Sequence, residues 1–219
     1  MVAHRGRKVM IDCGESWIGR IADLKPRAIA ITHAHPDHAF GLKAGSPCPV
    51  YATAKAWKMM KNFPIQKKFR NVLELHKTER IEGITFEAFA VTHSMHAPAL
   101  GYRISAGRVA LFYVPDVARI PNRSRAFAGI RLYIGDGATI TRPLTRHEKR
   151  THRLIGHASV ETQLAWCQKE DVRRMIVTHC GSAIVRGTGA AVRKKLRALE
   201  DKYGVKVQIA HDGMDVVLR

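Results

Sequence analysis

The stretch "THAHPDH", residues 32–38, places three histidines and one aspartate within seven positions. It follows the apolar run "AIAI" at 28–31, a pattern typical of a buried strand that ends in a loop. The proline in the stretch stiffens this loop, because its ring fixes the backbone φ angle. A lone histidine is more often a structural residue, but this density of imidazole and carboxylate groups predicts a metal site at the end of the strand.

The spacing within the loop suits two metal ions. His33 and His35 are two residues apart, so both imidazoles can reach one ion. Asp37 and His38 lie one short turn later and can face a second, neighbouring position.

Polar residues close other apolar segments in the same way, and these residues are Asp12, His93, Asp116, Asp136 and His179. Loops at strand ends place binding groups on a rigid scaffold. Short apolar segments alternate with helical patterns, and no internal repeat or linker separates them. This organisation predicts a single layered α/β domain over residues 1–219 with its site along one sheet edge.

The periodicity of apolar residues locates the elements of this domain. Ser159 can cap the second helix at its N-terminus, and Gly204 can end the third. We expect strands at 8–12, 28–32, 49–52, 84–92, 109–114, 132–134, 175–178 and 205–209, and helices at 54–62, 160–170 and 190–203.

The charge of the chain is less ordinary than its hydrophobic content. Lys+Arg 37 against Asp+Glu 18 gives a formal net charge of +19. Such a charge attracts polyanions and disfavours an apolar, neutral substrate, although a solubilising coat without a specific partner is the alternative. No apolar run approaches the ~18 residues of a membrane span, and the N-terminus lacks a secretion signal, so we expect a cytoplasmic protein with no membrane partner. The four cysteines lack paired spacing and are expected to be free thiols.

The motifs together resemble those of the metallo-β-lactamase-fold superfamily, and within it the ribonuclease Z-like phosphodiesterase branch. The resemblance extends from residue 10 to the C-terminus and implies an α/β, four-layer αββα sandwich. The matching stretches, in the family's order, are "MIDCGE", "THAHPDH", "THS" with "APALGYRI", "FYVPD", "GHASVETQ", "IVTHCGS" and "AHDGMDVVL".

This resemblance implies a role for each matching residue. Asp12 resembles a buried aspartate that supports the metal loop of the family. Two Zn²⁺ ions suit the implied ligands, with Mn²⁺ and Fe²⁺ as alternatives. The resemblance assigns His33, His35 and His93 to the first ion, Asp37, His38 and His179 to the second, and Asp116 to a bridge between the two. His96 remains an alternative to His93, because neither has the family's usual spacing to the "GY" pair.

Asp136 and His157 are the predicted proton-handling pair. In the similar enzymes, an acidic residue in a segment like "YIGDGAT" pairs with the histidine of a "GHS" motif to handle the leaving-group proton. Together with Asp37, these two residues form the predicted catalytic set. A departing alkoxide needs a proton, and a histidine that titrates near neutrality can supply it. The alternatives are a turn residue at Asp136 and a histidine bonded to local backbone at His157.

A basic segment, "TRPLTRHEKRTHR" at 141–153, separates these two residues. A basic loop near the site would suit a phosphate backbone, although a solvated helix face explains the charges equally well. The segment carries Arg142, Arg146, Lys149, Arg150 and Arg153 against the single Glu148.

Two departures from the family qualify the resemblance. A further strand and hairpin precede the "MIDCGE" strand in relatives, so we expect a late start or a sheet without its first strands, whose open edge would favour a homodimer. The arm by which ribonuclease Z grips transfer RNA has no counterpart, which argues against that particular reaction.

The resulting functional hypothesis is a dinuclear metal-dependent phosphodiesterase that acts as a nuclease on RNA or DNA, with nucleic acid as its partner. The main alternative is a small-molecule hydrolase of the same fold that acts on a cyclic phosphodiester, a lactone or a β-lactam. A non-catalytic nucleic-acid-binding protein is the weakest alternative, because every implied ligand position is filled.

Overall fold

A computed structural model describes residues 1–219, which divide into two units. Unit 1 comprises Met1–Ala90 and Met95–Tyr102, and unit 2 comprises Val91–Ser94 and Arg103–Arg219. Strand β8 (Ala99–Ala106) contributes residues to both units.

A five-stranded sheet forms the centre of unit 1, in the order β1-β2-β3-β4-β5. Strand β1 pairs with β2 in the antiparallel sense, and β2 to β5 pair in parallel. The run "AIAI" supplies β3, all of whose residues are buried, as expected for a parallel strand covered on both faces. The core of this unit includes Ile29, Ile31, Leu42 and Met60, none of which has exposed surface.

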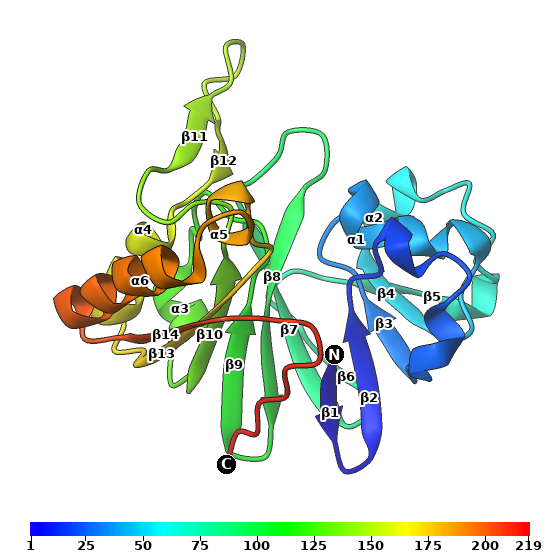
Figure 1. Cartoon of the computed structure of the whole chain (residues 1–219). Coiled ribbons are helices and arrows are strands. Elements are labelled where there is room, and N and C mark those ends of the chain that lie inside the picture. The colour runs from blue at the N-terminus through cyan, green and yellow to red at the C-terminus, as the bar shows by residue number, and fades with distance from the viewer. The chain divides into compact units, whose positions relative to one another are not determined.

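Four parallel strands, β9, β10, β13 and β14, form the centre of unit 2, with β10 between β9 and β13. Helices α4 and α6 contact one another, and each packs against strands of this group (Figure 1). The Ser159 hydroxyl accepts the Thr162 N–H at the start of α4, and Gly204, with φ of 65°, ends α6. Both predicted helix signals are therefore confirmed.

Both sheets are mixed and are flanked by helices, which confirms the predicted α/β class. The second sheet has the order β14-β13-β10-β9-β8-β7-β6, in which β6 and β7 form an antiparallel hairpin.

The bounds of the strands other than β8 are β1 (Val2–His4), β2 (Arg7–Ile11), β3 (Ala28–Ala30), β4 (Val50–Thr53), β5 (Arg70–Leu73), β6 (Thr78–Ile81), β7 (Ile84–Val91), β9 (Val109–Tyr113), β10 (Leu132–Asp136), β11 (Leu144–His147), β12 (Leu154–His157), β13 (Arg174–Thr178) and β14 (Lys206–Ile209). The α-helices are α1 (Pro36–Ala39), α2 (Ala54–Met59), α3 (Arg123–Phe127), α4 (Val160–Lys169), α5 (Ser182–Val185) and α6 (Gly189–Tyr203), and the 3-10 helices are η1 (Glu15–Trp17), η2 (Ile21–Leu24), η3 (Phe40–Ala44) and η4 (Lys67–Phe69).

Every strand and helix expected from the sequence is present, with ends shifted by a few residues. The solvated helix considered for the basic segment is not formed. The segment instead supplies β11 and the turn of the antiparallel hairpin β11–β12. Figure 1 shows this hairpin rising away from the rest of unit 2. No helix has both the length and the apolar character needed to cross a membrane.

Candidate metal centre

The metal loop of unit 1, residues 32–38, leaves β3 and runs into the short helix α1. His35 precedes the first helical residue, Pro36, at which a proline is favourable because its φ angle suits the helix and no N–H is needed. The His38 N–H donates to the His35 carbonyl at 3.1 Å. The loop and its single helical turn thus hold four ligand-type side chains close together.

These four side chains form two converging pairs of ligand-type atoms. His33 Nε2 lies 3.0 Å from His35 Nδ1, and His38 Nε2 lies 3.4 Å from Asp37 Oδ2. His33 and His38 are buried, whereas the Asp37 side chain is 57% exposed. The two pairs are those that the spacing of the loop predicts for two ion positions.

Asp12, directly after β2, holds the metal loop through its carboxylate. It accepts the Thr32 N–H at 2.7 Å and the Thr32 hydroxyl at 2.8 Å, and it lies 2.8 Å from His38 Nδ1. The same hydroxyl lies 3.0 Å from His33 Nδ1. A histidine bonded through Nδ1 presents Nε2 to a metal, and such outer contacts fix the orientation of the ring.

The backbone of the loop packs directly against the turn that follows β2. The Cys13 N–H donates to the His38 carbonyl at 2.6 Å, and the Gly41 N–H donates to the Cys13 carbonyl at 2.8 Å. A Cβ at Gly14 would lie 2.3 Å from the Asp37 carbonyl oxygen, and one at Gly41 would lie 2.5 Å from Cys13 Sγ. Only glycine fits so close an approach, so the two turns fix each other's position.

Unit 2 gathers Asp116, Asp136, His157 and His179, whose ligand-type atoms all lie within 4.8 Å of one another. Asp116 follows β9, Asp136 ends β10 and His179 follows β13. Because these three strands are parallel neighbours, their carboxyl ends deliver the side chains to one edge of the sheet. Asp116 Oδ1 lies 3.2 Å from His179 Nδ1 and 3.5 Å from His157 Nδ1.

Asp136 has no exposed surface, and its carboxylate is held by three partners. It accepts the Val117 N–H at 3.0 Å and the Ala138 N–H at 2.8 Å, and it lies 2.7 Å from His157 Nδ1. Burial lowers the pKa of His157, but the hydrogen bond to Asp136 and the charges of Asp136 and Asp116 outweigh it, so the pKa lies above its usual value. Asp136 therefore orients His157 and stabilises its protonated form.

Gln163 on α4 is a positioning residue that the sequence interpretation missed. It is fully buried, its Nε2 donates to the Asp136 carbonyl at 2.7 Å, and its Oε1 accepts the Asp136 N–H at 2.9 Å. The same oxygen accepts the Tyr133 hydroxyl at 2.7 Å. A glutamine at a buried position of a helix is the signal that identifies a clamp of this kind, in which one side chain holds the backbone of another residue.

The two histidine candidates near residue 95 differ in burial. His93 belongs to unit 2 and is buried, whereas His96 belongs to unit 1 and is exposed. His93 Nδ1 lies 3.2 Å from the Gly156 carbonyl oxygen, and its ring centroid is 4.9 Å from that of His157. A contact of Nδ1 with a carbonyl is typical of metal-binding histidines, which favours His93 over His96.

The donor sets of the two units fit divalent transition metals. Imidazole nitrogens and carboxylate oxygens are the ligands that Zn²⁺ accepts, and oxygen atoms of neighbouring groups contact several of the rings from behind. Unit 1 brings together His33, His35, Asp37 and His38, and unit 2 brings together His93, Asp116, Asp136, His157 and His179.

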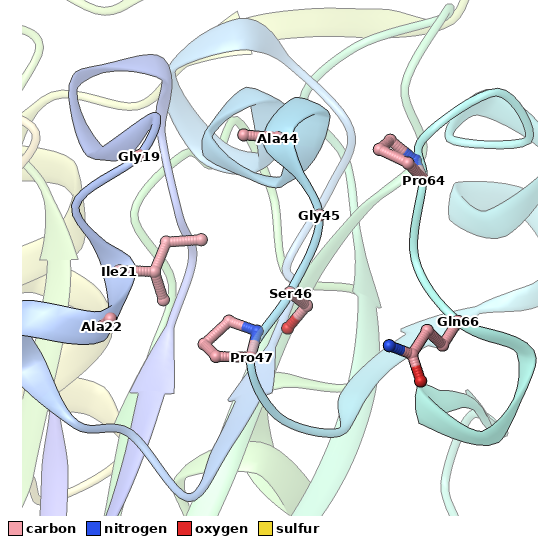
Figure 2. Close-up of a pocket in the computed structure, with 9 residues that line it drawn as sticks. All are labelled: Gly19, Ile21, Ala22, Ala44, Gly45, Ser46, Pro47, Pro64 and Gln66. Atoms are coloured by element: carbon pink, nitrogen blue, oxygen red, sulfur yellow. The ribbon is translucent and has the colours of Figure 1, made fainter.

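A pocket of about 370 Å³ lies elsewhere in unit 1, beside η2 and the turn after η3 (Figure 2). Ile21, Pro47 and Pro64 give it apolar walls, and the amide of Gln66 points toward Ser46. None of the candidate ligands lines this pocket, so it is separate from the metal loop.

Comparison with known families assigns the class of the protein. The family described as "Beta-lactamase superfamily domain" matches residues 7–180, and the chain belongs to this family. With its histidine and aspartate clusters, it is a metal-dependent hydrolase of the metallo-β-lactamase fold. A search of curated proteins found no match.

Solved structures share this fold over nearly the whole chain. Zn(2+)-bound PqqB from Methylobacterium extorquens is 18% identical with a TM-score of 0.73, covering 99% of this chain and 86% of that chain. A diphosphatase from the PhnP family is 17% identical with a TM-score of 0.67, covering 99% of this chain and 82% of that chain. Human tRNase Z, short form, is 16% identical with a TM-score of 0.62, covering 97% of this chain and 89% of that chain. The predicted metallo-β-lactamase fold is therefore confirmed.

Proposed function

We propose that the protein is a dinuclear metal-dependent phosphodiesterase of the ribonuclease Z-like branch that cleaves polynucleotides. The observation that carries this proposal is the pair formed by His157 Nδ1 and Asp136 Oδ2 at 2.7 Å, within the cluster that includes Asp116 and His179. Cleavage of a ribose or deoxyribose phosphodiester expels an alkoxide, a poor leaving group whose departure is aided by a proton donor such as this pair.

The ligands come from both donor sets, as the family resemblance implies. His33, His35 and His93 would hold one ion, Asp37, His38 and His179 the other, and Asp116 would contact both. Two Zn²⁺ ions, or Mn²⁺ or Fe²⁺ in their place, would polarise a phosphoryl oxygen and lower the pKa of bound water.

His157 would deliver the proton that the leaving group requires. Its Nδ1 is engaged by Asp136, so the proton would be transferred from Nε2 on the other side of the ring. The raised pKa of His157 keeps the ring protonated closer to neutral pH, the state required of a general acid. The backbone contacts of Asp136 and the clamp by Gln163 would hold this pair during turnover.

The net charge of +19 supports a polyanionic substrate over a neutral one. Two of the structural neighbours, a diphosphatase and a tRNase Z, are named for phosphorus-containing substrates, which supports phosphoester chemistry on this scaffold.

The test compares hydrolysis of bis(p-nitrophenyl) phosphate, a lactone and a β-lactam, each with and without added zinc or manganese. We expect metal-dependent hydrolysis of the phosphodiester alone and about two metal ions per chain by elemental analysis. Preferential hydrolysis of the lactone or the β-lactam would instead identify a small-molecule hydrolase. Full activity in metal-free protein would exclude the mechanism.

A further inference from the structure

The hairpin β11–β12 of unit 2 ends at the candidate general acid. His157 is the last residue of β12, and its Nδ1 lies 2.7 Å from Asp136. The next residue, Ala158, donates its N–H to the Val117 carbonyl at 2.6 Å, and the Gly156 N–H donates to the His93 carbonyl at 2.8 Å. The base of the hairpin is thus hydrogen-bonded on one side of His157 to the candidate ligand His93 and on the other side to Val117, which follows the candidate ligand Asp116.

The register of the hairpin determines which side chains share a face with His157. Leu144 pairs with His157 and Arg146 pairs with Ile155, whereas Thr145 pairs with Gly156. Paired residues in an antiparallel ladder point to the same side, and the side alternates with each step. Arg146 therefore lies on the face of His157, and Thr145 lies on the opposite face.

A second arginine continues this face. The Glu148 N–H donates to the Arg153 carbonyl at 2.9 Å, which extends the pairing outward beyond β11 and β12. Arg153, Ile155 and His157 are separated by steps of two residues, so all three share one face. Each step of two residues measures about 7 Å along a strand, which is comparable to the separation of neighbouring phosphates in an extended polynucleotide.

The two arginines are available to an anion. Both are exposed, and neither is engaged in an ion pair. The one carboxylate of the segment, that of Glu148, accepts the Arg150 N–H at 3.0 Å and the Thr151 N–H at 2.7 Å. It therefore stabilises the turn of the hairpin by bonding to backbone.

We infer that Arg146 binds the phosphate next to the scissile one, and that Arg153 binds the phosphate one step further out. This inference rests on the proposed phosphodiesterase function and specifies how a polynucleotide is held. A guanidinium group binds phosphate through two parallel N–H bonds, so each arginine can hold one phosphate in a fixed position.

The experiment compares a dinucleoside monophosphate, whose only phosphate is scissile, with the same compound bearing a terminal 5′- or 3′-phosphate. Both ribose and deoxyribose forms are assayed. The variants are Arg146→Ala and a double variant, Thr145→Arg with Arg146→Thr, which moves the charge to the opposite face at constant composition. Arg193→Ala on α6 is the matched control, because it removes an exposed arginine remote from the hairpin in sequence.

For the wild type, we expect one of the additional phosphates to raise kcat/KM about tenfold, as a charged hydrogen-bonding contact provides. Arg146→Ala and the double variant should lose this preference and retain the rate on the dinucleoside monophosphate, whereas Arg193→Ala should retain both. An unchanged preference in Arg146→Ala, or in the double variant, would overturn the inference. A wild type that hydrolyses no phosphodiester would overturn the proposed function itself, and with it this inference.

Discussion

Asp12 joins the end of β2 to the metal loop through Thr32 and His38. Its φ of 59° is a left-handed value that asparagine also tolerates, so Asp12→Asn removes the charge with little change in backbone strain. Without the carboxylate, His38 loses the partner that orients its ring, and we expect metal affinity to fall about 10–100-fold. Competition with a graded series of chelators measures this change.

Asp23→Asn is the control for this substitution, because Asp23 is an exposed aspartate of the same unit, 3.9 Å from Arg20. It should leave metal affinity unaltered. If Asp12→Asn binds metal as tightly as the wild type, the support of the loop by Asp12 is wrong.

His157 should matter only where the leaving group needs a proton. We expect His157→Ala to lower the rate on a ribose alkoxide leaving group by about 10²–10⁴-fold and to spare a p-nitrophenolate ester. His147→Ala, on the opposite face of the same hairpin, should affect neither rate. Equal losses on both esters would identify His157 as a structural residue.

At the scale of elements, Gly156 connects the hairpin to the site. Its φ is 109°, and a Cβ there would lie 2.0 Å from the Leu144 carbonyl oxygen. Gly156→Ala should therefore displace β12 from β11 and move His157, with the same selective loss on alkoxide leaving groups as His157→Ala. Circular dichroism should show that the sheets persist, because the hairpin lies outside them.

Gly107→Ala is the matched control for this substitution. Gly107 has a φ of 59°, and a Cβ added there would have no atom within 4 Å, so alanine should cost only about 1–2 kcal/mol of stability. Retention of the wild-type rate in Gly156→Ala would show that the hairpin base does not position His157.

Most elements that the sequence predicts have strong apolar patterns, although the largely buried strand β8 is not among the predicted strands. Strand β3 is buried along its whole length and appears in the sequence as an uninterrupted apolar run. Strands β6 and β11 are missed because their residues are mostly or wholly exposed and show no apolar pattern. Helices α1 and α5 span four residues each, too few to show a helical period.

The residues of the candidate site likewise differ in whether the sequence alone reveals them. The four ligand-type residues of 33–38 lie within six positions, and others stand at or just after the ends of apolar strands, so both kinds are visible in the sequence. The contact between Asp136 and Gln163 joins a strand to a helix 27 residues later, and no local pattern reports it. Likewise, the spacing around His93 and His96 leaves the choice open, and the burial of His93 is a property of the folded unit.

For the whole molecule, the net charge of +19 predicts binding to polynucleotides that weakens steeply with salt. Each neutralised phosphate contributes about −0.7 to −0.9 to the slope of log K against log salt. Reversing the charges of the hairpin should reduce this slope by about three units and slow polynucleotide cleavage, with little effect on bis(p-nitrophenyl) phosphate. The four residues reversed are Arg146, Lys149, Arg150 and Arg153.

The matched variant reverses four exposed charges on α6, at Arg193, Lys194, Lys195 and Arg197. It should retain most of the salt slope and of the polynucleotide rate. Equal losses in both variants would indicate a general basic coat, and an absence of binding at low salt would point to a small phosphodiester as substrate.

The exposed turn of the hairpin also makes the protein vulnerable to proteases. Lys149, Arg150 and Arg153 are exposed in or beside this turn, the kind of position that trypsin cuts first. The parallel ladder of β9, β10, β13 and β14 lies outside this turn and would hold the two fragments together. Cleavage of one peptide bond in the turn would then leave an enzyme that still hydrolyses small esters but binds long polynucleotides more weakly. A bound polynucleotide would in turn protect this site from trypsin.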